Sequence, residues 1–220
     1  MPGEPTAVAA QGRTVTLVSY TPSLVPQLSF PQPSLEVPEV RALIEELALA
    51  EIGTTCNHYN DAVPGAALRR ARLNAYLHAR WHARYLLVGE AAGYRGCRLS
   101  GIAFTSEHQL GAGPMKEPSA TIVHRALAEL DCEDDVLLWN IVPTHPHLPG
   151  RPQSNRTPTD QELRLGAGFV PILASGRTIV PVGRLAGTSL GLMGLRHPAH
   201  GGARAFRSGL ASVLGQALPA

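Results

Sequence analysis

Two hydrophobic periodicities alternate along the chain. Apolar residues recur at helical spacing in five segments, at 36–52, 66–79, 119–130, 160–174 and 203–218. Short continuous apolar runs occur at 85–88, 136–142, 178–182 and 190–195. A Gly or Pro follows close behind each run, as is common where a buried strand gives way to a turn. The pattern therefore predicts helices that alternate with four short, buried strands.

Buried strands that alternate with helices are typical of a parallel sheet covered on both faces. We therefore predict an α/β fold, a three-layer α/β/α sandwich with a central, mainly parallel four-stranded sheet. Residues 1–36 are rich in Pro and are expected to form an N-terminal arm, with a short strand at 15–18. Residues 37–220 are expected to form a single domain around the sheet.

Composition narrows the classes of protein to which the chain can belong. The 220 residues are 44% hydrophobic, which fits one domain with a substantial core. Three widely spaced cysteines favour reduced thiols and a cytoplasmic protein, and no apolar run reaches the length of a membrane span or signal peptide. The net charge of +2 is compatible with a nucleic-acid partner but does not indicate one alone. The arginines Arg69, Arg70 and Arg72 are expected on the solvated face of the 66–79 helix.

The candidate chemistry follows the predicted strands. Ligands of open parallel sheets bind beyond the carboxyl ends of the strands. Glu90, Asn140 and His197 stand at or just after three of these ends, so a carboxylate, an amide and an imidazole should converge on one polar pocket. Phe104 follows in a loop from which its ring can stack on a base, although a lone Phe is more often part of the core. The glycine-rich segment 89–96 lacks the spacing of a P-loop or dinucleotide fingerprint, and its alternative interpretation is an ordinary turn.

Two short histidine segments raise a metal-dependent hydrolase as another possibility. Residues 144–147 read Thr-His-Pro-His and residues 197–200 read His-Pro-Ala-His. Neither has the spacing of an HExxH or CxxC ligand set. We therefore expect no metal ion, and loop histidines that are hydrogen-bonded or exposed.

Four segments taken in order resemble a known family. They are GEAAG at 89–93, GIAF at 101–104, WN at 139–140 and RHPA at 196–199. This order, over roughly residues 84–210, is similar to the uracil-DNA glycosylase superfamily, especially its iron–sulfur (family 4) branch. The resemblance implies a monofunctional glycosylase, expected to be a monomer, that flips uracil or a related deaminated base out of DNA. It would then hydrolyse the N-glycosidic bond and so initiate base excision repair.

The resemblance also assigns residues to roles. Glu90 would lie near the attacking water, and His197 would donate a hydrogen bond to O2 of the base. Phe104 would stack on the flipped base, and the Asn140 amide would read the pyrimidine edge. The remaining implied site residues are Gly89 and Ala91 at the base and Arg156, Ala199, His200, Gly201 and Arg204 at the DNA.

The chain also departs from the family pattern. Three scattered cysteines cannot supply the four ligands of the cluster, so we expect no iron–sulfur cluster, no other cofactor and a colourless protein. Ala92 and Ala199 replace the usual Pro and Ser, and the segment His200-Gly201-Gly202 stands where a bulkier wedge would enter the duplex. Gly93 offers no side chain to block the methyl group of thymine. These departures keep open an alternative, a catalytically weak or inactive relative that binds damaged DNA.

Overall fold

The computed structural model describes residues 28–30 and 36–215, so the strand predicted at 15–18 lies outside the described residues. The described chain contains one sheet of three parallel strands in the order β2-β1-β3. These are β1 (Tyr85–Ala91), β2 (Val136–Val142) and β3 (Thr178–Pro181). The predicted parallel sheet is confirmed, with β1 at its centre.

The sheet is held in register by apolar pairs. Tyr85 pairs with Val136 at one end of β1, and Ala91 pairs with Val142 at the other. All seven residues of β2 are buried, as expected for a strand that is covered on both faces. Because β1 continues through Glu90 to Ala91, the predicted catalytic carboxylate belongs to a strand rather than to a loop.

The prediction of a fourth strand at 190–195 is wrong for the described chain. Leu190 is the last residue of helix α7 (Arg184–Leu190), and Gly191 ends that helix in the left-handed region at φ +64°. Only a single parallel bridge, between Val182 and Leu195, extends the sheet here. A Cβ at Gly194 would lie 2.5 Å from the carbonyl oxygen of Gly183. The apolar run is therefore a helix end and a tight return, whose glycines permit a close backbone approach.

The helices agree with the pattern in most places. The remaining α-helices are α1 (Pro38–Leu49), α2 (Ala66–Ala79), α3 (Cys97–Ser100), α4 (Pro118–Glu129), α5 (Asp160–Ala167), α6 (Val170–Ala174) and α8 (Ala203–Val213), with a short 3-10 turn at Glu133–Asp135. The helix predicted at 160–174 is divided, because Gly168 caps α5 and a Pro stands at the start of α6. The short helices α3 and α7 were not predicted.

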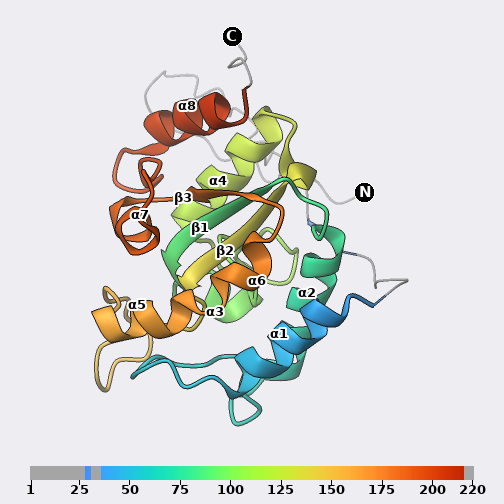
Figure 1. Cartoon of the computed structure of the whole chain (residues 1–220). Coiled ribbons are helices and arrows are strands. Elements are labelled where there is room, and N and C mark those ends of the chain that lie inside the picture. Colours follow the sequence, from blue (N-terminus) through green and yellow to red (C-terminus); the bar gives the residue numbers. More distant parts are fainter. Residues whose placement is uncertain (1–27, 31–35, 216–220) are drawn as a thin grey trace, which may run out of the picture.

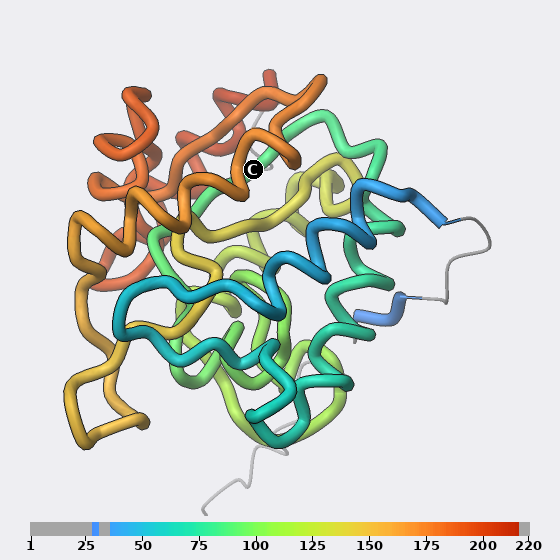
Figure 2. The backbone as a smooth tube through the Cα atoms, turned by 60° about the horizontal axis from the view of Figure 1, so that its bottom comes forward, coloured from blue at the N-terminus to red at the C-terminus, as the bar shows by residue number. Residues whose placement is uncertain are grey.

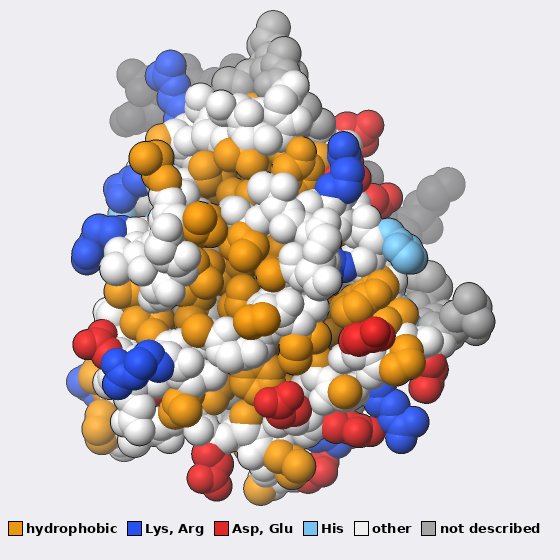
Figure 3. All heavy atoms as spheres, in the orientation of Figure 1, with side chains coloured by type: hydrophobic (Ala, Val, Ile, Leu, Met, Phe, Trp, Pro, Cys, Tyr) orange, Lys and Arg blue, Asp and Glu red, His pale blue; other side chains and the backbone are white. Residues whose placement is uncertain are grey.

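Helices cover both sides of the sheet. Figure 1 shows α4 and α8 on one side and α1, α2 and α6 on the other, and Figure 2 brings α1 to the front with α8 behind. Figure 3 shows hydrophobic side chains over the middle of the face seen in Figure 1, with charged side chains towards its edges. Gly166 lets α5 approach β2, because a Cβ there would collide with the carbonyl oxygen of Ile141. In the described part of the chain, no helix is long and apolar enough to cross a membrane.

Candidate active site

An open pocket of ≈ 530 Å³ lies where β1 ends. It brings together five of the residues predicted from the sequence, namely Glu90, Ala91, Arg156, His197 and His200. The other residues that line it are Ala92, Gly93, Glu117, Ser119, Pro146, Asn155 and Thr157. The position of the pocket agrees with the rule that ligands bind beyond the carboxyl ends of parallel strands.

His197 is held as a hydrogen-bond donor. Its Nδ1 accepts a hydrogen bond from the backbone N–H of Ala199 at 3.2 Å, so the proton of the neutral ring is on Nε2. Burial, together with the neighbouring His200 and Arg196, lowers the pKa of His197 below its usual value. The ring is therefore neutral at pH 7 and has one N–H available for a ligand.

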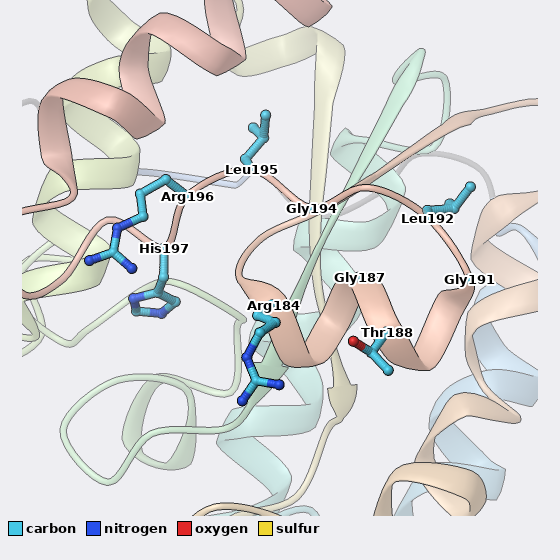
Figure 4. Close-up of a pocket in the computed structure, with 9 residues that line it drawn as sticks. All are labelled: Arg184, Gly187, Thr188, Gly191, Leu192, Gly194, Leu195, Arg196 and His197. Carbon is cyan, nitrogen blue, oxygen red and sulfur yellow. The ribbon is translucent and has the colours of Figure 1, made fainter.

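Glu90 shares this pocket with His197. Burial raises the pKa of the Glu90 carboxyl, and the positive charge of Arg184 opposes that shift. Figure 4 shows the side chains of Arg184 and His197 extending to the same side of the backbone. A carboxylate of raised basicity beside a neutral imidazole can accept a proton from water while the imidazole donates to another atom.

A second hollow, of ≈ 620 Å³, adjoins the first and shares His197 with it (Figure 4). Arg184, Thr188 and Arg196 bring polar groups to its lining. Among the described residues, the guanidinium groups of Arg184, Arg196 and Arg204 have no hydrogen bond or ion pair. These three cations lie around the His197 loop and remain available for phosphate groups.

The loop that follows His197 turns tightly and projects outward. His200 is exposed and adopts φ +52°, which is uncommon for a residue other than Gly. Gly201 follows at φ +78°, and a Cβ there would meet no atom within 4 Å. The predicted DNA-binding residues 199–201 therefore form a surface turn whose tip carries no bulky apolar side chain, and Arg204 follows in the first turn of α8.

Phe104 and Asn140 meet at Gly89, behind the open pocket. Both side chains are buried, with exposed fractions of 6% and 4%. A Cβ at Gly89 would collide with the Phe104 ring and would lie 2.6 Å from Oδ1 of Asn140. Phe104 adopts φ +50°, an unusual backbone conformation that directs its ring to this position. Three of the four residues predicted to hold the base, Gly89, Phe104 and Asn140, therefore lie together, and Gly89 directly precedes Glu90 in the chain.

Arg156 lines the pocket but is fully engaged within the protein. Its guanidinium donates to both oxygens of Glu162, to Oγ1 of Thr54 and to the carbonyl oxygens of His147 and Thr157. These bonds use all five N–H donors of the side chain. The DNA contact expected of Arg156 therefore requires this network to open.

The Arg156–Glu162 pair should contribute strongly to stability. Glu162 is 1% exposed, and its hydrogen bond with Arg156 lowers the pKa of its carboxyl to about 2. A lowered folded-state pKa stabilises the fold above the ordinary value of 4.5, and the contribution is lost as the pH falls towards 2. Glu162→Gln removes the buried charge and leaves the Arg156 guanidinium, whose side chain is 16% exposed, without its charged partner, so we expect a loss of up to about 3–5 kcal/mol at pH 7 in urea unfolding.

The exposed pair Arg84–Asp135 provides a matched control for this loss. Its side chains are 67% and 39% exposed, so Asp135→Asn should cost less than about 1 kcal/mol. Equal effects of the two substitutions at pH 7 would show that the Arg156–Glu162 pair is not the strong contact described above.

Several pocket residues have no signal in the sequence pattern. Glu117 directly precedes α4, and Ser119 lies in its first turn. Asn155 accepts a hydrogen bond from the backbone N–H of Tyr94 at 2.9 Å, which ties the loop at 155–157 to the glycine-rich segment 89–96. In the described ranges, no three His, Cys, Asp or Glu side chains converge as metal ligands.

The comparisons with known proteins concern the fold. No protein-family model and no curated protein matches the chain. The crystal structure of wild-type Pedobacter heparinus SMUG2 does match, with a TM-score of 0.60. The match covers 80% of this chain and 97% of that chain, at 14% sequence identity. The protein therefore has the same fold as SMUG2.

Proposed function

We propose that the protein is a monofunctional DNA glycosylase that hydrolyses the N-glycosidic bond of uracil, or a related deaminated base, and initiates base excision repair. The observation that carries the proposal is the neutral His197, whose free Nε2–H shares a pocket with the Glu90 carboxylate. The fold shared with SMUG2, a member of the uracil-DNA glycosylase superfamily, supports the same assignment.

Base recognition follows from the groups around Gly89. A base must leave the duplex stack before an enzyme reaches its glycosidic bond, at a cost of a few kcal/mol. Stacking on the Phe104 ring offsets part of that cost. The Asn140 amide accepts from N3–H of uracil and donates to O4, whereas cytosine reverses both groups and leaves buried polar atoms unpaired. Mismatches of this kind discriminate by roughly 10⁴–10⁵-fold.

Bond cleavage places negative charge on the departing base and positive charge on the sugar. The Nε2–H of His197 donates to O2 and stabilises the charge on the base, as an oxyanion-hole donor does. Glu90 orients the attacking water and accepts its proton. The chain has a single lysine, Lys116, and no lysine lines the pocket, which supports attack by water rather than by an amine.

The unpaired arginines would hold the DNA backbone. Arg184, Arg196 and Arg204 surround the His197 loop, and Arg is well suited to phosphate because its planar guanidinium forms paired hydrogen bonds. The tip of that loop, at Gly201, has no wedge side chain to open a duplex. Single-stranded DNA, in which the base is already unpaired, is therefore the favoured substrate.

A second candidate function is binding of damaged DNA without efficient cleavage. The observation that favours it is the burial of Phe104 and Asn140 behind the open pocket. A base must displace these contacts before it is read, and slow displacement would leave a protein that binds damage but turns over poorly.

Single-turnover assays on uracil-containing oligonucleotides, both single-stranded and duplex, test the proposal. Release of free uracil and alkali-labile abasic sites, faster from the single strand, is the expected result. Tight, uracil-dependent binding without release would support the second candidate. An absence of both would reject the two together.

Phe104→Leu should weaken binding of uracil-containing DNA by about 1–3 kcal/mol, because Leu keeps the apolar volume but removes the stacking ring. Titration of single-stranded oligonucleotides with and without uracil measures this loss. Phe169 is equally buried, at 5% exposed, and lies outside the pocket, so Phe169→Leu is the matched control. If both variants lose only thermal stability and bind like the wild type, Phe104 is simply a core residue.

A further inference from the structure

Glu117 fills a gap that Gly93 leaves in the pocket wall. A Cβ at either Gly93 or Gly96 would collide with the Glu117 carboxylate, so this group occupies the space that a side chain at residue 93 would need. It reaches that space from the start of α4, a separate element of the fold. The sequence of the glycine-rich segment 89–96 suggests a pocket wall without a side chain at residue 93. In the structure, the carboxyl group of Glu117 occupies that part of the wall.

This carboxyl group is polar but has no partner. Within the described residues, no hydrogen bond or ion pair to its oxygens is found, and it lines the pocket with Glu90 and His197. Burial raises the pKa of Glu117 to about 7. The group is therefore partly protonated at neutral pH, and it offers both an O–H donor and a carbonyl acceptor.

Glu117 lines the same pocket as Glu90 and His197, on the side that Gly93 leaves open. In the proposed function, His197 forms a hydrogen bond with O2 of the base, and Asn140 forms hydrogen bonds with N3–H and O4. The edge of the base that contains C5 would then face the part of the pocket wall that neither residue forms.

We propose that Glu117 is a specificity-determining residue, whose carboxyl group faces C5 of the flipped base and excludes thymine. This inference rests on the proposed function and names the group that selects among its substrates. A hydrogen at C5 leaves room for a water molecule that satisfies the carboxyl group. A 5-methyl group removes that water and offers no hydrogen bond in return, so the half-buried carboxyl group, covered by the bound base, loses its partner. An apolar wall would discriminate against one methyl group by only about 10–200-fold.

Binding to uncleavable DNA isolates this selectivity from the chemical step. We would measure Kd for single strands that contain 2′-fluoro-2′-deoxyuridine or its 5-methyl analogue, and the excision of uracil and thymine in parallel. Glu117→Ala should raise relative binding of the 5-methyl analogue by about 100-fold and permit thymine excision, and the readout is the ratio between the two bases rather than the rate on uracil. Glu117→Gln keeps the shape and polarity and should retain the preference for uracil.

Glu107→Ala is the matched control, because its carboxylate also covers a glycine, Gly113, but does not line the pocket. An unchanged Kd ratio in Glu117→Ala overturns the inference, as does a wild type that binds both analogues equally. Loss of uracil excision in both Glu117 variants, at an unchanged ratio, would assign the residue to chemistry and also overturn it. A wild type that prefers the uridine analogue but releases no uracil rejects the proposed activity alone.

Discussion

His197→Ala is expected to slow single-turnover uracil excision by about 10²–10³-fold, while the affinity for uracil-containing DNA changes little. The Nε2–H bond to O2 strengthens only as negative charge develops on the departing base. Interactions specific to the transition state affect turnover more than ground-state binding. Rapid-quench measurement of the excision rate, with Kd measured separately, distinguishes the two effects.

The control for this experiment is His200→Ala. His200 lines the same pocket but is exposed, and it should tolerate the change far better. Wild-type rates in both variants would remove the 196–199 segment from the catalytic site. A defect confined to His200→Ala would mean that the motif has been aligned in the wrong register.

Asn140→Asp is expected to reduce uracil excision by up to about 10⁴-fold, measured per folded molecule. A carboxylate cannot donate to O4 of uracil, and its charge would face that acceptor inside a buried site. Asn140 is also buried, so thermal unfolding should accompany the assay.

The control is Asn155→Asp, which introduces the same change at an exposed position of the pocket rim. It should leave the rate within a few-fold of the wild type. If Asn140→Asp excises uracil as well as this control does, Asn140 does not read the base.

The fold was predictable where local pattern and burial agree. The apolar run at 136–142 and the helical spacing at 66–79 coincide with β2 and α2, because each is bounded by a change in periodicity. The strand predicted from the apolar run at 190–195 was wrong, because short apolar runs do not distinguish a strand from the end of a buried helix. The backbone freedom of Gly191 and Gly194, rather than hydrophobicity, decides the path there.

The site was predictable only where it follows strand ends. Glu90 and His197 line one pocket as expected, but nothing near Glu117 in the sequence indicates that it closes the same wall. Arg69 illustrates the same limit. It was expected in solvent, but it is buried, and its Nε donates to the carbonyl oxygen of His58 at 2.6 Å. Packing between different segments of the chain determines where these polar groups lie, and a single sequence does not display it.

The position of β1 between β2 and β3 has a consequence for biosynthesis. Tyr85 pairs with Val136 on one side and with Thr178 on the other, so every strand pair joins segments far apart in the chain. Such non-local pairing is slow, because a long loop must close before any ladder forms. During translation β1 must wait, with both edges unpaired, until β2 and then β3 leave the ribosome. The strand that carries Gly89 and Glu90 is thus the segment of the nascent chain most in need of protection from aggregation.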